Sequence, residues 1–377
     1  MKFKKIIKNT VIFLAISSML LGCNSSNSST NENSSNEVSK LIENEEATNE
    51  DNNPKTDLVK EDNIKENINT KKYTNEDLKN DKINELGKIM VLMYHSIGEE
   101  ESTWTRTYDN FKKDLNTLYE KKYEAISLND YASGNINTKY GFTPVVFTFD
   151  DGNENNFSVI EENGEIKIDP NCAVGIMDEF KKAHPDFNMT ATFFLNANPF
   201  NQDKYYEYKL NYLIENGYDI GNHTIGHNNL SKIKDSNKIQ EVIGKEIELV
   251  NNYVSNYDVN TLALPFGGYP KEDDLYKFIE EGKYKNINYK NNAILLVGWD
   301  PYKSPFHKDF DSSKIRRVRA SEMNVDDVGL YDWLRRFDEN KQIRYISDGN
   351  PNTIVIPNNF EEVLSGANIK DKDIIKY

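Results

Sequence analysis

A regular alternation of short apolar runs with amphipathic stretches, beginning at Ile89, constrains the fold of this chain most strongly. The apolar runs occupy residues 89–93, 145–149, 190–195, 218–220, 261–264 and 293–297. The helix-like stretches are residues 173–182, 205–215, 238–253 and 274–281. This alternation predicts an α/β domain with a mainly parallel sheet covered by helices. In a barrel built this way the chemistry lies at the carboxyl ends of the strands, so a functional motif should directly follow a strand.

The first 23 residues have the order of a bacterial lipoprotein signal peptide. Four lysines precede the apolar run Val11–Ile16, which is followed by Leu20-Leu-Gly-Cys23. The run is too short to span a membrane comfortably, and the last four residues match a lipobox. We therefore expect cleavage before Cys23 and lipidation of its sulfur, which would anchor the protein to the extracellular face of the cell membrane. The alternative is an ordinary cleaved signal with an accidental cysteine.

Residues 24–85 are rich in Asn, Ser, Glu, Lys and Asp and hold almost no aromatic residues. Such a segment cannot bury enough apolar surface to offset the loss of conformational entropy on folding, which predicts a disordered, flexible linker. We expect one folded domain over residues 86–377, with its core motifs in residues 89–305 and a C-terminal extension in residues 306–377.

The charge and cysteine content exclude some partners. The formal net charge of −15 repels phosphate backbones, so we expect no binding to nucleic acid, whereas a neutral glycan is unaffected. Two cysteines, Cys23 and Cys172, are too few for a disulfide framework, and Cys172 has the character of a small buried hydrophobe. We expect a monomer.

Two adjacent carboxylates end the apolar run at residues 145–149. Asp150 and Asp151 repel each other unless a cation compensates, and a bound metal ion would do so. Neighbouring residues on a strand point to opposite sides, and Gly152 permits the turn that would let one carboxylate bind metal while the other stays free as a base. A surface turn with no ligand is the alternative.

A histidine pair follows the apolar run at residues 218–220. His223 and His227 are four residues apart, so in a helical turn they would share one face and could chelate one ion. A third segment, Leu264–Gly268, also follows a strand. The turn formed by Pro265, Phe266 and Gly267 exposes backbone N–H groups that could face a developing oxyanion, although a plain loop is the better interpretation of this segment by itself.

Together these motifs predict a metal site with one carboxylate and two histidines beside a second, free carboxylate. A set of three protein ligands leaves a position for water, as in catalytic rather than structural zinc sites. Such sites make water acidic enough to act as a nucleophile near neutral pH. The predicted chemistry is metal-assisted hydrolysis of an acyl group.

At this point the sequence resembles the polysaccharide deacetylase family, also called the NodB-homology group. The resemblance spans about residues 89–305 and is densest at Thr-Phe-Asp-Asp-Gly and His-Thr-x-x-His. It implies a distorted (β/α)7 barrel in which Asp150 is the general base. It also implies that Asp151, His223 and His227 bind a divalent ion, usually Zn²⁺. The implied reaction removes N-acetyl groups from N-acetylglucosamine-type residues of a cell-wall or extracellular polysaccharide.

The sequence departs from the pattern of this family in three places. Ala263 stands where the family has an arginine that orients the catalytic aspartate, and no histidine follows His307 to act as general acid. An insert at residues 153–171 separates the first motif from the next helix. Trp299 corresponds to a residue that would line the acetyl pocket. His95 follows the first apolar run, so we consider it as a replacement acid, with a structural histidine as the alternative.

These departures keep two further functions open. A glycan-binding surface lipoprotein could retain the metal but have weak or no activity, and an O-acetyl esterase would need the same residues. The basic cluster Lys314–Arg319 could contact an anionic wall polymer, or it could be a solvated face or form internal salt bridges.

Overall fold

The computed structural model describes residues 73–365 and 367–377 of the 377-residue chain. The signal peptide, the lipidation site Cys23 and most of the expected linker therefore lie outside the described residues. Within the part that is described, no helix is both long and apolar enough to span a bilayer.

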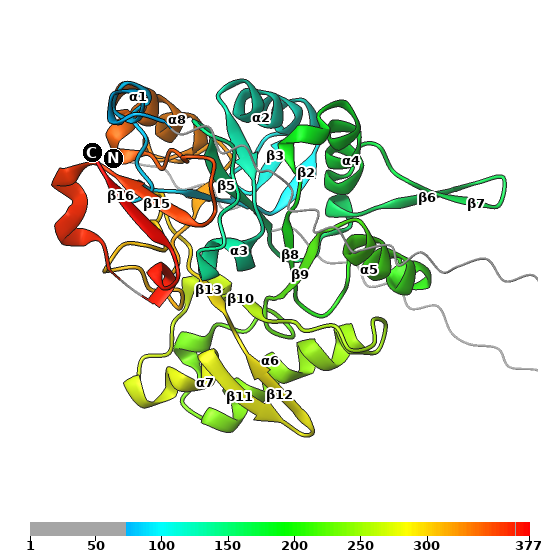
Figure 1. Cartoon of the computed structure of the whole chain (residues 1–377). Helices are drawn as coiled ribbons and strands as arrows, with labels where there is room; N and C mark the ends of the chain where they lie inside the picture. Colours follow the sequence, from blue (N-terminus) through cyan, green and yellow to red (C-terminus); the bar gives the residue numbers. More distant parts are fainter. Residues whose placement is uncertain (1–72, 366) are drawn as a thin grey trace, which may run out of the picture. The chain divides into compact units, whose positions relative to one another are not determined.

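The centre of the domain is an eight-stranded sheet in which every pairing is parallel. Its order is β13-β10-β9-β8-β5-β1-β14, and β4 pairs with β5 beside this path. The sheet curls into part of a barrel with helices outside it (Figure 1), so the predicted distorted β/α barrel is confirmed. The strands are β1 Met90–Tyr94, β4 Tyr123–Ala125, β5 Thr143–Phe149, β8 Thr192–Leu195, β9 Asp219–Asn222, β10 Thr261–Ala263, β13 Ala293–Leu295 and β14 Val318–Arg319.

Helices lie between the strands of this sheet. They are α2 Tyr108–Glu120, α3 Leu128–Ser133, α4 Ala173–Ala183, α5 Tyr206–Glu215, α6 Ser236–Asn251, α7 Lys277–Glu280 and α8 Leu330–Glu339. All of them except α3 pack against the outer face, whereas the buried residues of α3 belong to the interior of the curled sheet. Local sequence fixes α6 well: the side chain of Asp235 caps its first turn, and its apolar residues recur at helical spacing and are buried. The helix expected over residues 274–281 is shorter than predicted, because the chain turns into strand β11 at Glu281.

Four two-stranded units lie outside the central sheet. They are β2 Ser96–Gly98 with β3 Thr105–Thr107, β6 Val159–Glu162 with β7 Glu165–Ile168, β11 Glu281–Tyr284 with β12 Ile287–Lys290, and β15 Thr353–Ile356 with β16 Asp373–Lys376. The insert at residues 153–171 contains the β6–β7 hairpin, which extends away from the rest of the domain in Figure 1.

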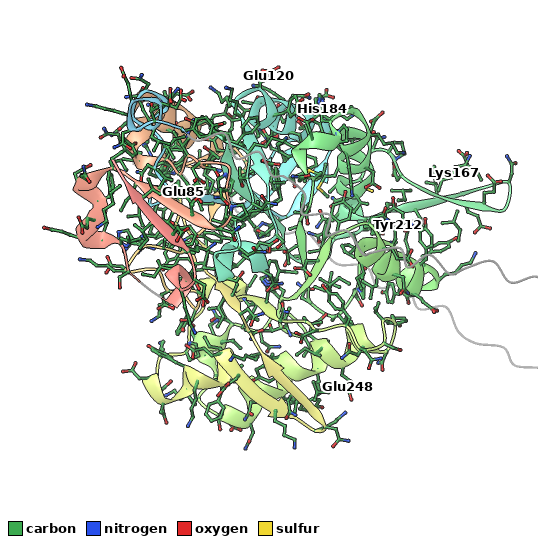
Figure 2. The ribbon with its side chains drawn as sticks, in the orientation of Figure 1. Glu85, Glu120, Lys167, His184, Tyr212 and Glu248 are labelled. Atoms are coloured by element: carbon green, nitrogen blue, oxygen red, sulfur yellow. The ribbon has the colours of Figure 1, made fainter. Side chains whose placement is uncertain are left out.

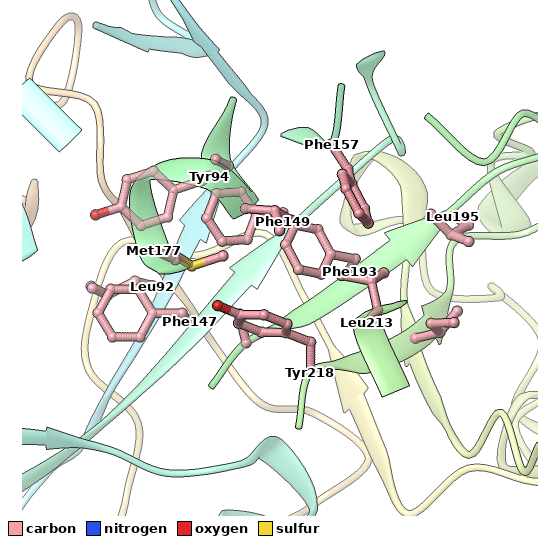
Figure 3. Packing of buried hydrophobic residues seen from close by; sticks show 14 of the residues in the cluster. Leu92, Tyr94, Phe147, Phe149, Phe157, Met177, Phe193, Leu195, Leu213 and Tyr218 are labelled. Atoms are coloured by element: carbon pink, nitrogen blue, oxygen red, sulfur yellow. The ribbon is translucent and has the colours of Figure 1, made fainter. Parts of the chain in front are cut away.

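Two apolar clusters hold the two faces of the sheet. The larger one packs strand residues against the outer helices. In its centre the Phe149 ring stacks on Tyr94 at 5.1 Å and on Phe193 at 4.9 Å between ring centroids (Figure 3). Truncation of a buried phenylalanine of this kind to alanine costs about 3–5 kcal/mol. This packing fixes the strand that carries Asp150 and Asp151.

The second cluster fills the inside of the curled sheet. Inward-facing residues of the strands, among them Val146 and Ala263, pack there against Tyr345 and Ile354 of the C-terminal extension. The extension therefore closes the interior of the barrel. Figure 2 shows Glu85 inside the domain, whereas the charged side chains of Glu120, Lys167 and Glu248 lie at its rim.

Helix α1 (Asn75–Asp81) corrects the expected linker. Thr74 caps this helix in a capping box, and Leu78 packs with Ile83 against Ile346 and Val355 of the extension. These contacts bring residues 73–85 into the folded domain, so the linker ends before residue 85. Leu78 is the one apolar residue of this seven-residue helix, which was too weak a signal within a polar segment.

Candidate metal centre and active site

The carboxyl ends of β5 and β9 bring the predicted motifs together. Asp150 continues the ladder of β5, because its N–H donates to the carbonyl of Tyr94 at 3.0 Å. Asp151 then adopts φ 76° and Gly152 φ 61°. A Cβ on Gly152 would lie 2.9 Å from Leu195 Cδ2, so the turn requires glycine for both its conformation and its close packing. The predicted turn is therefore present. Asp150 extends the ladder of β5, whereas Asp151 lies in the turn.

Asp151, His223 and His227 form a cluster of three donor atoms that lie within 4.8 Å of one another. Asp151 Oδ1 lies 3.5 Å from His223 Nε2 and 3.4 Å from His227 Nε2. Ligands of a tetrahedral zinc site are separated by about 3.3 Å, so both distances from Asp151 are compatible with such an ion. The two histidines do not lie on a helix as expected. Left-handed conformations at Thr224 and His227 make the turn instead.

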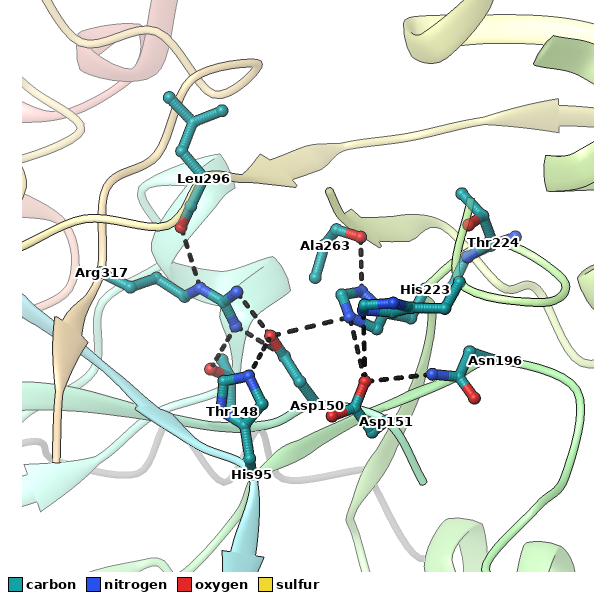
Figure 4. Close-up of polar contacts among 12 residues, drawn as sticks. His95, Thr148, Asp150, Asp151, Asn196, His223, Thr224, Ala263, Leu296 and Arg317 are labelled. Atoms are coloured by element: carbon teal, nitrogen blue, oxygen red, sulfur yellow. Dashed lines mark hydrogen bonds and ion pairs between the residues drawn. The ribbon is translucent and has the colours of Figure 1, made fainter. Parts of the chain in front are cut away.

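Neighbouring groups orient these ligands. Nδ1 of the buried His223 lies 2.7 Å from the carbonyl oxygen of Ala263, which leaves Nε2 directed at the cluster (Figure 4). Asn196 Nδ2 donates to Asp151 Oδ1 at 3.0 Å. Partners of this kind fix the tautomer and rotamer of metal ligands and raise metal affinity. The contact of Ala263 with His223 is made by the backbone carbonyl, so it does not depend on the side chain at position 263.

Buried charged residues on helices α5 and α6 hold the segment that carries Asn196. Ala197 and residues 200–202 have positive φ, and the N–H of Ala197 donates to Glu246 Oε2 at 2.8 Å. Lys209 Nζ donates to the carbonyls of Phe200 and Asn201 at 2.9 and 3.1 Å. Burial raises the pKa of Glu246 to about 8 and lowers the pKa of Lys209 to about 8. Both buried groups support a strained segment that contacts the metal cluster.

Arg317 clamps the second carboxylate. Its guanidinium donates to both oxygens of Asp150 at 2.7 Å, to Thr148 Oγ1 at 3.1 Å and to the carbonyl of Leu296 at 3.0 Å (Figure 4). Arg317 is fully buried and Asp150 almost so. Burial alone would raise the pKa of Asp150, but Arg317 and then His223 hold it well below its usual range. Asp150 is therefore ionised and fixed in one rotamer.

Arg317 is the functional residue that the sequence analysis missed. It belongs to the basic cluster Lys314–Arg319, for which an internal salt bridge was one of three interpretations. The contact comes from the residue that precedes β14, and it replaces the arginine whose expected position holds Ala263. Gly298 permits this arrangement, because a Cβ there would lie 2.8 Å from the backbone nitrogen of Arg317.

His95 lies at the site, on the opposite side of Asp150 from the metal cluster. Its Nε2 is 3.8 Å from Asp150 Oδ2, and its ring lies 4.6 Å from the ring of Trp104. Burial lowers the pKa of His95 to about 4, although Asp150 opposes this shift. The imidazole is therefore neutral at pH 7 in the free protein.

The Pro265–Gly267 turn borders the site at His227, and Trp299 lines a cleft together with Met93 and Trp104. Phe266 has φ 59°, is 67 % exposed, and packs edge-on against His227 with 4.6 Å between ring centroids. The N–H of Gly267 donates to the carbonyl of Leu264 at 2.9 Å, so it is engaged within the turn and does not face a substrate. Trp299 is 62 % exposed, and its carbonyl accepts a hydrogen bond from Trp333.

Part of the chain that forms this site matches a known protein family. Residues 138–278 match the polysaccharide deacetylase family. The matched polysaccharide deacetylase segment contains Asp150, Asp151, both histidines of the cluster and the Phe266 turn. His95, Trp299 and Arg317 lie outside it. A search of curated proteins finds no match.

Solved structures of deacetylases resemble part of the chain. A polysaccharide deacetylase from Bacillus cereus is 18 % identical over 66 % of this chain and 69 % of its own, with a TM-score of 0.48. A Streptococcus pyogenes deacetylase in complex with acetate is 14 % identical over 66 % of this chain and 98 % of its own, with a TM-score of 0.46. IcaB from Ammonifex degensii is 14 % identical over 63 % and 93 %, with a TM-score of 0.43. Because these scores are below 0.5, the chemistry is argued from the residues of this chain.

Proposed function

We propose that this protein is a metal-dependent hydrolase that removes N-acetyl groups from N-acetylglucosamine-type residues of a cell-wall or extracellular polysaccharide. The observation that carries the proposal is the pairing of two differently held carboxylates. Asp150 is ionised and clamped by Arg317, whereas the adjacent Asp151 belongs to the cluster with His223 and His227. A pure binding protein has no use for a buried, free carboxylate at that place.

The proposed metal is Zn²⁺, held by Asp151, His223 and His227. A bound zinc ion would polarise the acetyl carbonyl and lower the pKa of water. Asp150 would accept the proton of the attacking water, with Oδ2 lying 3.9 Å from His223 Nε2 at the edge of the cluster. The backbone N–H of Phe266 would face the developing oxyanion, since the N–H of Gly267 is engaged.

We assign to His95 the delivery of a proton to the leaving nitrogen. Because His95 is neutral at pH 7, it would take up this proton during each turnover, and Asp150 lies 3.8 Å away to supply it. Trp299 would line the acetyl pocket. The low pKa of His95 also favours the second candidate, a glycan-binding surface lipoprotein with weak activity, because an acid that is rarely protonated contributes little.

The same proposal includes the location of the protein. A lipid on Cys23 would hold it at the extracellular face of the cell membrane, with the linker giving the domain access to peptidoglycan or to an exported N-acetylglucosamine polymer. Labelling of cells with a palmitate analogue would test this: the label should appear on the protein and be absent from Cys23→Ser.

Acetate release tests the enzymatic proposal. The purified protein is incubated with Zn²⁺ or Co²⁺ and with chitooligosaccharides or N-acetylated peptidoglycan, and Asp150→Asn serves as the control. Release by the parent and its loss in Asp150→Asn would support the deacetylase. If neither releases acetate although one metal ion binds per chain, the binding function is favoured. Release from O-acetylated substrates alone would favour the esterase.

A further inference from the structure

A pocket of about 540 Å³ lies at the opposite end of the sheet from the metal cluster, and the proposed chemistry does not use it. The ends of helices α1, α2 and α8, the turn before β5 and residues 341–346 line this basal pocket. Figure 1 shows the three helices along one edge of the domain, and Figure 2 labels Glu120 at that edge. Strand β5 leads from the pocket to Asp150, and its seven residues span roughly 20 Å.

The basal pocket has an excess of positive charge in an acidic chain. Its charged lining residues are Lys82, Lys121, Lys122, Lys341 and Arg344, with Asp81, Glu120 and Asp338. Five positive and three negative charges leave an excess of two, whereas the whole chain has a net charge of −15. Asp81 accepts a hydrogen bond from Tyr140 at 2.7 Å, and Asp338 pairs with Lys121 at 2.5 Å. Within the described part of the chain, the other three lysines of the pocket form no ion pair.

Two of these lysines occupy unusual backbone positions. Lys82 follows α1 with φ 58°, and Lys122 stands two residues after α2 with φ 61°. A left-handed residue after a helix is most often glycine, because a side chain is unfavourable there. The dipole at a helix C-terminus favours a nearby cation, but it does not require that cation at the left-handed position. Both lysines place their charge in the lining of the pocket instead.

Arg344 is the residue that points to an anionic ligand. Its side chain is 7 % exposed, and its Nε is buried without a hydrogen-bond partner in the described structure. Nη1 lies 3.9 Å from Asp338 Oδ1, which is too long for a hydrogen bond, and the guanidinium lies 5.4 Å from the centroid of the Tyr123 ring. A buried charged donor without an acceptor is unfavourable. An anion in the pocket would supply that acceptor.

The backbone of Arg344 is held firmly beside β1. Its N–H donates to the carbonyl of Lys341 at 3.2 Å, and the next N–H, of Tyr345, donates to the carbonyl of Lys88 at 3.0 Å. A Cβ on Gly87 would lie 2.1 Å from the carbonyl carbon of Arg344, so this close approach requires glycine. The backbone that carries the buried guanidinium is therefore preorganised, which lowers the entropy lost on binding.

The charge and size of the basal pocket favour an organic phosphate. A phosphate monoester carries nearly two negative charges at pH 7, which matches the excess of two positive charges, whereas a carboxylate carries one. The planar guanidinium of Arg344 suits bidentate binding of phosphate oxygens. The volume is in the range of small-molecule pockets and exceeds that of a phosphate ion. Tyr140 and Ile346 in the wall would contact the carbon atoms of an ester.

We propose that the basal pocket binds a phosphate monoester, with Arg344 as the bidentate donor and Lys82 and Lys122 as further positive charges. A soluble phosphate ester and the headgroup of a phosphatidic acid share this chemistry. The pocket is independent of the proposed hydrolase, because the length of β5 separates it from the metal cluster.

Calorimetric titration of the zinc-free protein with glycerol 3-phosphate at low salt tests the proposal. We expect a Kd below about 1 mM and no binding of glycerol. Arg344→Gln should weaken binding at least about tenfold, and Lys82→Gln and Lys122→Gln about threefold each. Lys79→Gln is the matched control and should bind like the parent, since Lys79 is exposed in the last turn of the same helix as Lys82 but lies outside the pocket lining.

The two lysine variants keep the test decisive if Arg344→Gln does not fold, because both side chains are exposed and their loss should leave the urea midpoint unchanged. Absence of binding by the parent at about 10 mM glycerol 3-phosphate would overturn the proposal. Equal affinity in the parent, Lys82→Gln and Lys122→Gln would do the same. Inorganic phosphate that binds as tightly as glycerol 3-phosphate would contradict the ester.

Sedimentation with vesicles distinguishes the two sources of the ester. Retention on vesicles that contain phosphatidic acid, reversed by glycerol 3-phosphate and weakened in Lys82→Gln, would support a lipid headgroup as the ligand. Calorimetric binding of glycerol 3-phosphate without retention on these vesicles would support a soluble ester.

Discussion

Replacement of Arg317 tests the reasoning about the site most directly. Its guanidinium makes four hydrogen bonds, two of them to Asp150 at 2.7 Å, and both partners are buried. Removal of one partner of a buried ion pair costs about 3–5 kcal/mol, because the other charge is left uncompensated. A domain is stable by about 5–15 kcal/mol, so Arg317→Met should lose a large part of that stability. Arg317→Lys keeps the charge without the bidentate contact and should lose less.

Urea unfolding of the zinc-free protein, followed by tryptophan fluorescence, provides the measurement. We expect Arg317→Met to be destabilised by about 3–5 kcal/mol and the double variant Arg317→Met with Asp150→Asn to recover at least about 2 kcal/mol of this. In Arg317→Lys, kcat for acetate release should fall about a hundredfold, because the base is no longer fixed in position. A loss below about 1 kcal/mol in Arg317→Met, or additive effects in the double variant, would refute the ion-pair argument.

The remaining predictions concern the groups around this pair. Asn196→Ala should weaken Zn²⁺ binding about 10–100-fold in a competition titration with a chelating dye, because Asp151 loses an orienting partner; unchanged affinity would contradict this. Burial raises the pKa of Glu246 from 4.5 to about 8, so its contribution to stability is fully present below pH 4.5 and is lost as the pH rises through about 8. Glu246→Gln should therefore flatten the decrease in unfolding free energy between pH 5 and pH 8 by roughly a few kcal/mol, and parallel profiles for the two proteins would contradict the assignment. Ala263→Arg alone should be destabilising by roughly 3 kcal/mol, because a second guanidinium enters a buried site with one carboxylate, and combination with Arg317→Ala should restore part of the urea midpoint.

The sequence predicts six of the eight strands of the sheet, because these six are apolar runs that are almost entirely buried, but it does not predict β4 and β14. Strand β5 is apolar except for Thr143, Pro144 and Thr148, and all of its residues are buried, so its signal does not depend on periodicity. Helix α2 was not predicted. Its buried apolar residues are Phe111, Leu115 and Leu118. Polar residues are more numerous in this helix, so the segment does not stand out by composition.

The candidate site was also predicted only in part. Asp151, His223 and His227 were recognisable because their motifs follow strands β5 and β9, although the turn at Thr224 was not foreseen. Arg317 was not recognisable from spacing, since it reaches Asp150 across 167 residues of sequence. One signal was available: Ile315 and Val318 lie two residues before and one residue after Arg317 and are buried, and an arginine buried between apolar residues needs a buried carboxylate as partner.

The location of Arg317 just before β14 also has a consequence for biogenesis. The aspartate and the guanidinium that restrains it are separated by 167 residues, and the interior around them is closed by residues near the C-terminus. A chain that is synthesised from its N-terminus contains Asp150 long before Arg317 follows. Until then the carboxylate lacks its ion-pair partner, so the proposed base would be assembled only after Arg317 has been added to the chain. A premature stop after residue 305 would retain the family motifs and yet give a protein without an assembled base.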